Sequence, residues 1–174
     1  MTEVSICTWV RIPNPMIPHI YTFVSYATEF DVNVMRFENL YAGSYTLFAI
    51  ITGRQFTFLE EPGFDTWTFW CFTWSMNPEH YLLYLNAAAV FTVDVPGNPS
   101  NIMIEGGGVL ILGQEQGELG NSFNELKSFQ GSITEFHLWN RFIREQEIRI
   151  LMEAYVNKSP YGGYCQVNQG KEGG

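Results

Sequence analysis

Short strand-like runs separated by turn signals constrain the fold of this chain more than any other feature. The runs are rich in aromatic, Thr and β-branched residues and recur about every 8–12 residues. Pro and Gly mark the breaks between them, as in Pro62-Gly63. The expected strands are 4–11, 21–27, 32–38, 44–51, 55–59, 67–74, 81–86, 90–95, 109–112 and 131–139. Such a series is typical of a β-sandwich or barrel, so we predict an all-β fold.

One segment has the period of a helix instead. Residues 144–155 contain strong helix formers, and their apolar positions, from Ile148 to Tyr155, lie three or four residues apart. This pattern predicts a single short helix lying on the sandwich. The residues that follow, 157–174, are polar and Gly-rich and predict a loose tail, which leaves one domain over residues 1–156.

Two tryptophan-bearing strands are expected to contribute to the core. In the segment 132–139 the residues alternate, so that Ile133 and Trp139 are predicted to share a face with the two odd-numbered residues between them. The other strand is the aromatic run at 67–74. We therefore predict that Trp74 and Trp139 are both largely buried in the common core.

The charge balance excludes several classes of protein. The chain has 18 Asp and Glu against 9 Lys and Arg, a formal net charge of −9, so its surface repels nucleic acids and anionic membranes. The most apolar stretches, 40–53 and 81–93, are shorter than the roughly 18–20 residues that a membrane-spanning helix requires. Because Glu3 stands where a signal peptide would carry Lys or Arg, we expect no export signal within the chain as given.

The three cysteines leave alternatives open. Cys7 and Cys71 both fall in expected strands, so they either form a disulfide in the core or remain two free buried thiols. Cys165 lies in the tail, where we expect it to be unpaired within the chain. The sequence contains no Cys-x-x-Cys motif and no Cys/His cluster, which argues against a zinc site.

A catalytic site is not predicted. The segment 29–33 (EFDVN) resembles the alternating carboxylates of some jelly-roll glycosidases, but its third position is Asn33, so one of the two carboxylates needed for glycoside cleavage is missing. The three histidines have no Ser or Cys nucleophile in an elbow-like context. We therefore predict that the chain is not an enzyme.

The loop after the strand 109–112 gathers oxygen-bearing side chains. Carboxylate, amide and backbone oxygens crowded on one loop are the ligands that calcium requires, although a solvated polar loop has the same composition. The residues concerned are Glu115, Gln116, Glu118, Asn124 and Glu125.

Two segments of the chain resemble the pentraxin family. The run FWCFTW at 69–74 matches the family signature His-x-Cys-x-Ser/Thr-Trp, with Phe69 in the His position followed by Cys71, Thr73 and Trp74. The second segment, 109–139, has the family's order of VLILGQEQ, a Gly/Asn-rich loop and SFQGSITEFHLWN. Its signature positions are Gly113, Gln114 and Trp139. The resemblance covers about residues 5–155, since the SYAT run at 25–28 is also similar to the family.

The resemblance implies a two-sheet antiparallel jelly-roll β-sandwich, lectin- and laminin-G-like, with one helix across it. It also implies an extracellular recognition role, as a secreted protein or in the ectodomain of a membrane protein such as an adhesion G-protein-coupled receptor. Family members join the cysteines equivalent to Cys7 and Cys71, often bind ligands through calcium on one face, and commonly form symmetric oligomers.

The calcium ligands implied by the family are only partly kept. The retained ligands are the Glu115 carboxylate, the Gln116 backbone oxygen and Asn33. Asn124 supplies a neutral oxygen in place of an acidic residue, and Asp31 is a neighbouring carboxylate that would take part if the alignment shifted by one. Glu118 and Glu125 are further candidates of that kind.

Three positions depart from the calcium-binding pattern in addition to Asn124. Val32 and Gly117 stand where the family has Asp, and Lys127 stands where it has Gln. Because calcium affinity depends on ligand charge and an ammonium repels the ion, we predict millimolar binding or none. Restoring the family residues at 117, 124 and 127 is expected to raise the affinity.

The leading functional hypothesis is a non-catalytic extracellular recognition or adhesion module that binds a glycan, a phospho-ligand or a protein partner, with weakened calcium dependence. The alternative is a structural jelly-roll module of a receptor ectodomain that assembles with partners and binds no small ligand. A third hypothesis is a degenerate glycoside-active enzyme.

Overall fold

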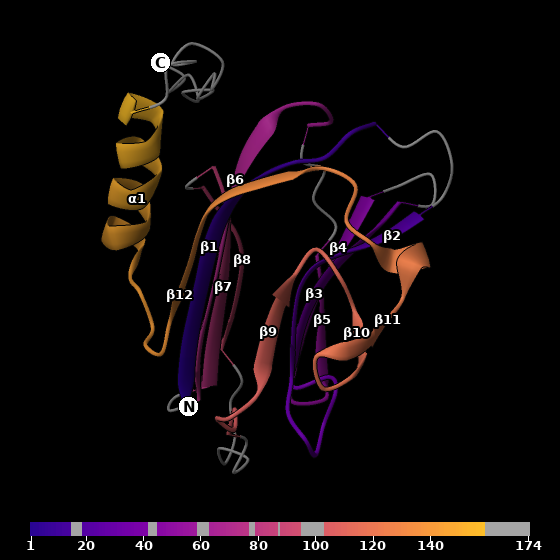
Figure 1. Cartoon of the computed structure of the whole chain (residues 1–174). Helices are drawn as coiled ribbons and strands as arrows, with labels where there is room; N and C mark the ends of the chain where they lie inside the picture. The colour runs from indigo at the N-terminus through magenta and orange to yellow at the C-terminus, as the bar shows by residue number, and fades with distance from the viewer. Residues whose placement is uncertain are drawn as a thin grey trace, which may run out of the picture.

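The structure is a computed structural model that describes residues 1–14, 19–41, 45–58, 63–76, 79–86, 88–94 and 103–158. Two five-stranded antiparallel sheets face each other and form a β-sandwich (Figure 1). The predicted all-β jelly-roll class with one helix is therefore confirmed. Cys165 and the predicted tail, apart from its first two residues, lie outside the described residues.

The first sheet, which we call the helix-side sheet, has the strand order β12-β1-β6-β7-β8. Its strands are β1 (Glu3–Arg11), β6 (Trp67–Met76), β7 (Glu79–Leu85), β8 (Ala88–Asp94) and β12 (Ser132–Trp139). The second sheet, the loop-side sheet, has the order β5-β4-β3-β2-β9. Its strands are β2 (His19–Ala27), β3 (Met35–Tyr41), β4 (Tyr45–Ile51), β5 (Arg54–Phe58) and β9 (Val109–Leu112).

All ten predicted strands correspond to strands of the two sheets, although their end residues Ser44, Leu59 and Val95 lie outside the described residues. Within the described part of the chain, the structure adds three short elements. These are β10 (Gln116–Glu118), β11 (Asn121–Phe123) and the 3₁₀ helix η1 (Glu125–Lys127). The largest boundary error is in β3, which begins at Met35 because residues 28–34 form the turn after β2. Residues 29–33, whose sequence resembles the alternating carboxylates of some glycosidases, thus lie in this turn and not along one strand.

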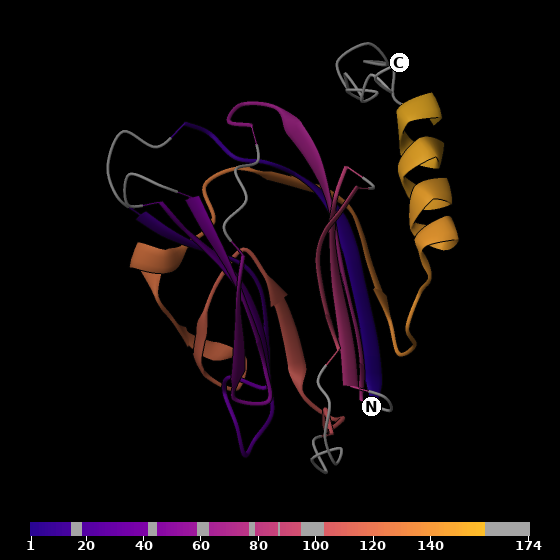
Figure 2. The ribbon, with the colours of Figure 1, turned by 180° about the vertical axis from the view of Figure 1, so that it is seen from behind.

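The helix α1 (Glu145–Lys158) packs on the outer face of the helix-side sheet (Figure 2). It begins where Glu147 accepts a hydrogen bond from the Arg144 backbone N–H at 3.1 Å, the capping arrangement that favours a helix start. Ile148 is fully buried, and the Tyr155 ring stacks on Trp9 with centroids 4.7 Å apart. The helix thus covers a second apolar cluster outside the sandwich core.

The Cys7–Cys71 disulfide lies within this second cluster. The two residues are register partners on the neighbouring strands β1 and β6, with Cα atoms 4.0 Å apart, slightly closer than the 4.4–6.8 Å usual for disulfides. The bond therefore joins two strands of one sheet beneath α1 and does not connect the two sheets through the core.

The predicted alternation in β12 is broken by a bulge. Between Cys7 and Trp9 of β1, the register of β12 jumps from His137 to Thr134. Glu135 has a φ of 49°, the left-handed conformation that accommodates the extra residue. Phe136 therefore packs with Ile133 against the sandwich core, contrary to the single face predicted for the odd-numbered residues.

The two tryptophans have different surroundings. Trp74 is buried in the sandwich core, as predicted. Trp139 is only partly buried and packs with the cluster under α1, so the prediction that it belongs to the common core is wrong. Its ring stacks on His137 with centroids 5.3 Å apart.

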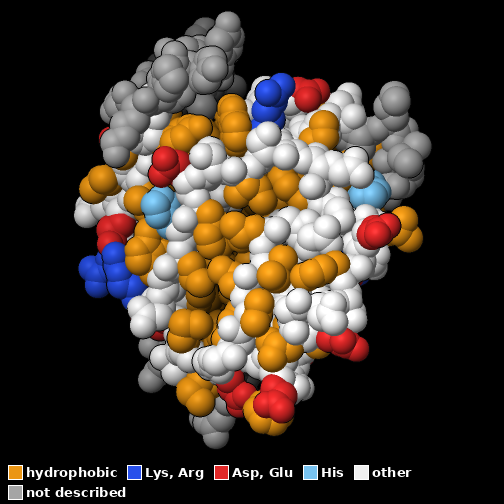
Figure 3. All heavy atoms as spheres, in the orientation of Figure 1, with side chains coloured by type: hydrophobic (Ala, Val, Ile, Leu, Met, Phe, Trp, Pro, Cys, Tyr) orange, Lys and Arg blue, Asp and Glu red, His pale blue; other side chains and the backbone are white. Residues whose placement is uncertain are grey.

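One edge of the sandwich exposes inward-facing side chains. Leu138 of β12 is the register partner of Ile6, and Leu112 of β9 is the register partner of Val24. Because Ile6 and Val24 belong to the core, both leucines lie on the inner face of their sheet. They are nevertheless 38% and 43% exposed, respectively. Figure 3 shows hydrophobic side chains gathered in a band over the strip between these two edge strands. The sandwich is thus open between β9 and β12.

Candidate functional site

The candidate site is on the outer face of the loop-side sheet, away from the sandwich core. The segment from Gly113 to η1, including the hairpin of β10 and β11, crosses this face (Figure 1). A cavity of about 30 Å³ between the sheets is lined by apolar side chains apart from Thr8. Because that cavity offers almost no polar groups, the polar outer face is the better candidate for recognition.

Neutral hydrogen bonds hold the base of this segment against β2. The buried Gln116 amide donates to the carbonyl oxygens of Ser25 and Val109, both at 3.1 Å, and its Oε1 accepts from the Gly120 backbone N–H at 2.8 Å. The Ser25 hydroxyl donates to the Gln114 carbonyl oxygen at 2.7 Å. The GQEQ motif therefore positions the segment through its glutamines, while Glu115 between them is directed to the sheet.

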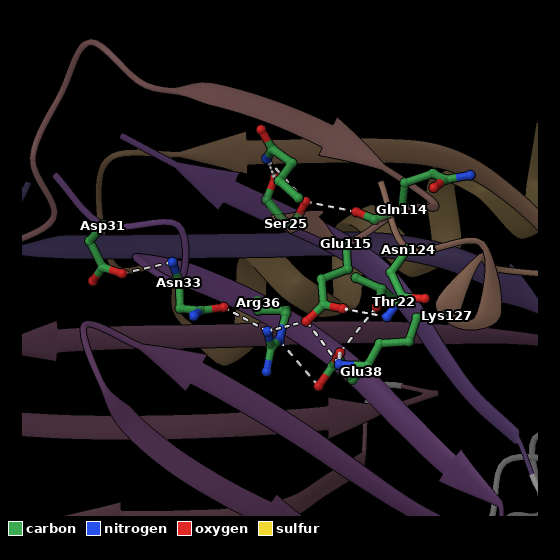
Figure 4. A network of polar contacts seen from close by, with 11 residues as sticks. Thr22, Ser25, Asp31, Asn33, Arg36, Glu38, Gln114, Glu115, Asn124 and Lys127 are labelled. Atoms are coloured by element: carbon green, nitrogen blue, oxygen red, sulfur yellow. Dashed lines mark hydrogen bonds and ion pairs between the residues drawn. The ribbon is translucent and has the colours of Figure 1, made fainter. Parts of the chain in front are cut away.

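Glu115 belongs to a cluster of four charged side chains (Figure 4). The Glu115 Oε1 atom pairs with the Arg36 guanidinium and also lies 2.8 Å from the Lys127 ammonium. Glu38 bridges the same two cations, 3.2 Å from Arg36 Nε and 3.6 Å from Lys127 Nζ. We call Arg36, Glu38, Glu115 and Lys127 the ionic cluster.

Neutral side chains complete the surroundings of the ionic cluster. The Asn33 side-chain oxygen accepts a hydrogen bond from Arg36 at 2.6 Å, and the Thr22 hydroxyl donates to Glu38 at 3.1 Å. The Asn124 amide donates to Glu115 at 3.4 Å.

The electrostatics of the ionic cluster are balanced. Two cations and two carboxylates cancel formally, and the four side chains range in exposure from 8% for Glu38 to 25% for Lys127. Taking a charge this far out of water is costly unless it is paired and hydrogen-bonded. Each carboxylate here faces both cations, which satisfies that requirement.

The structure brings together only some of the predicted calcium ligands. Glu115 is a member of the ionic cluster, and Asn33 and Asn124 form hydrogen bonds with it. The Asp31 carboxylate instead accepts a hydrogen bond from the Asn33 backbone N–H at 2.8 Å within its own turn. Glu118 and Glu125 are solvent-exposed. Among the described residues, no group of three or more His, Cys, Asp or Glu side chains could hold a metal ion.

The residues present do not fit a calcium ion at this place. Calcium takes six to eight oxygen ligands, usually including several carboxylates. The Glu115 carboxylate is already paired with two side-chain cations, which occupy the space beside it. At position 117 an aspartate is also disfavoured, because a Cβ on Gly117 would lie 2.8 Å from the Ser122 carbonyl oxygen.

Sequence reasoning missed Arg36 and Glu38. Their spacing of two residues on β3 places them on the same face of the sheet, which was the available signal. The signal is weak, since alternating charged residues on a strand are typical of any solvent-facing surface. Their role comes from a distant segment: Arg36 pairs with Glu115, 79 residues away in the sequence, and Glu38 pairs with Lys127.

The fold and the site together define a lectin-like jelly roll that carries a structured polar loop on one outer face. Comparison with known proteins identifies the family. A family model described as the pentaxin family matches residues 1–160, and the chain therefore belongs to the pentaxin, or pentraxin, family.

Curated relatives agree with this assignment. The chain is 29% identical over 150 residues to the pentraxin-related protein PTX3 of Mus musculus. The aligned region covers 83% of this chain and 37% of that protein. It is 30% identical over 148 residues to the neuronal pentraxin-2 of Homo sapiens, covering 83% of this chain and 32% of that protein. The chain thus spans about a third of the length of these relatives.

Solved structures show the same fold. A heptameric SAP-like pentraxin from Limulus polyphemus superposes with a TM-score of 0.73 at 18% identity, covering 87% of this chain and 70% of that one. The full extracellular region of zebrafish Gpr126/Adgrg6 has a TM-score of 0.64 at 17% identity, covering 85% of this chain and 19% of that one. Among the residues that the structure describes, no helix is long and apolar enough to cross a membrane.

Proposed function

We propose that this chain is a non-catalytic extracellular recognition or adhesion module of pentraxin type, with weakened calcium dependence. The ligand class is a glycan, a phospho-ligand or a protein partner. The observation that carries the proposal is the ordered polar segment on the outer face of the loop-side sheet, in a chain whose family assignment covers residues 1–160. An extracellular location is supported by the Cys7–Cys71 disulfide, because disulfides persist in oxidising compartments.

The proposal is tested by binding. The oxidised chain is applied to an array of glycans, phosphomonoesters and extracellular protein fragments, once in calcium and once in EDTA. Saturable binding that persists in EDTA supports the proposal. Binding that disappears in EDTA contradicts the weakened calcium dependence, and an array without any saturable signal contradicts the recognition role.

A second candidate function is assembly. The open edge of the sandwich, where Leu112 and Leu138 expose inner-face side chains, favours a structural module that associates with another chain. The Limulus relative is itself described as heptameric. Light scattering during size exclusion tests this candidate: association that Leu138→Lys abolishes supports it, and a monomer at all concentrations contradicts it.

A further inference from the structure

We propose that the Arg36 guanidinium and the Lys127 ammonium replace a metal ion as the built-in cations that fasten the loop-side segment 113–128 to the sheet. The two cations lie on the face of the sandwich to which we assign the recognition role above. The inference rests on that role only for what this face does biologically. It makes the order of the segment independent of calcium.

The first argument is the arrangement of oxygen atoms around the two cations. Arg36 Nη1 is shared by Glu115 Oε1 and by Asn33 Oδ1, the latter at 2.6 Å. Lys127 Nζ lies 2.8 Å from the same Glu115 oxygen and 3.6 Å from Glu38 Oε1. Oxygens from three separate residues thus converge on two nitrogen atoms, as oxygen ligands converge on a metal ion.

The second argument is charge. Arg36 and Lys127 together carry a formal charge of +2, the charge of one calcium ion, and the carboxylates of Glu38 and Glu115 neutralise it. Because the carboxylates are mostly buried, they need such a counter-charge in the folded state. The side chains supply this charge permanently, so no ion has to be taken from solution.

The third argument is connectivity. The contributing residues come from three parts of the chain: Asn33 from the turn after β2, Arg36 and Glu38 from β3, and Glu115 and Lys127 from the segment 113–128. Their contacts therefore cross-link the segment to the sheet near its start, at Glu115, and near its end, at Lys127 in η1. The Gln116 hydrogen bonds and the bridge between Thr22 and Ser128 hold the segment to β2 and β9 through neutral groups, and the two cations add the ties to β3.

The test removes the cations and leaves the oxygens. Hydrogen exchange of the segment 113–128 and calcium calorimetry are measured on the wild-type chain and on the double variant Arg36→Gln/Lys127→Gln, without any recognition ligand. In the wild type we expect equal exchange protection in calcium and in EDTA, with no saturable calcium isotherm. In the double variant we expect protection to be lost in EDTA and restored by calcium, with a Kd of about 10⁻⁴–10⁻³ M, as in extracellular calcium modules.

Two further variants serve as controls. Arg149→Gln removes one cation from the exposed Glu145–Arg149 pair on α1 and should change neither measurement. Arg36→Lys keeps a cation at this position and should retain part of the protection in EDTA. If the double variant does not fold, Lys127→Gln alone provides the test, with partial loss of protection in EDTA.

The proposal is overturned if the wild-type segment gains protection from calcium, or if the double variant remains protected in EDTA. Calcium binding absent from a folded double variant also overturns the claim that the cations occupy a metal's place. Because these measurements use no recognition ligand, a failed binding array leaves this inference standing, and a failed exchange experiment leaves the recognition role standing.

Discussion

Replacing Trp74 by alanine should strongly destabilise the protein, and the same change at Trp139 should not. Trp74 is 2% exposed and is flanked in register by Val4 and Tyr81, both of which are buried in the sandwich core. Trp139 is only partly buried at the edge strand β12, where its ring stacks on His137. The two variants therefore remove the same side chain from a core site and from an outer site.

The magnitude for Trp74 follows from its burial. A buried tryptophan removes about 150–250 Å² from water, which at about 25 cal/mol per Å² corresponds to roughly 4–6 kcal/mol. Alanine keeps part of this burial and the neighbours relax partially, so we expect a loss of about 3–5 kcal/mol. In a domain of this size that loss corresponds to a fall in Tm of roughly 6–20 °C. For Trp139→Ala we expect about 1–2 kcal/mol, because part of the ring remains in water.

Urea unfolding followed by circular dichroism, with the disulfide intact, measures both changes. The slope of the transition must remain similar in the two variants for the free energies to be comparable. A loss below about 1 kcal/mol for Trp74→Ala would show that this residue does not support the core. A Trp139 variant as unstable as the Trp74 variant would refute the division into an inner core and an outer cluster.

Two further predictions concern the helix-side sheet and the helix α1 that packs on it. Replacing Cys7 and Cys71 together by alanine should lower the free energy of unfolding in urea by about 4 kcal/mol, because the disulfide closes a loop over a sequence separation of 64 in the unfolded chain. Equal stability with and without the disulfide would contradict this prediction. Hydrogen bonds from Arg141 and from the Arg144 backbone lower the pKa of Glu147 to about 2, below its ordinary value of 4.5. The resulting stabilisation is present above pH 4.5 and is lost as the pH falls through 2. Glu147→Gln should therefore flatten the dependence of the unfolding free energy on pH between 4.5 and 2. An unchanged pH dependence in the variant would contradict this prediction.

The strands could be predicted from the sequence because each combines β-branched and aromatic residues with a turn signal at its end. The elements that were missed are too short to show such a combination. β10 and β11 have three residues each and are almost entirely exposed, so no hydrophobic pattern marks them. The bulge at Glu135 has no signal either, because a glutamate in the left-handed conformation is uncommon. Its effect was to reverse the face predicted for Phe136.

Only one of the two chain segments that form the candidate site could be predicted from the sequence. The GQEQ motif and the substitution at Lys127 were visible as a local departure from a known pattern. Arg36 and Glu38 belong to a strand whose alternation looks ordinary, and only the packing of a distant loop against β3 gives them partners. A site formed by two segments far apart in sequence is thus half visible when only one segment carries a motif.

The use of basic residues in this acidic chain supports an electrostatic role for the ionic cluster. The chain has only 9 Lys and Arg against 18 Asp and Glu, yet two of the nine occupy a single mostly buried cluster. A cation desolvated there without a counter-charge would destabilise the fold, so its position depends on Glu38 and Glu115. A metal ion in the same place would make the loop respond to calcium concentration and to chelators. Side-chain cations remove that response, because they remain attached to the chain whatever the calcium concentration.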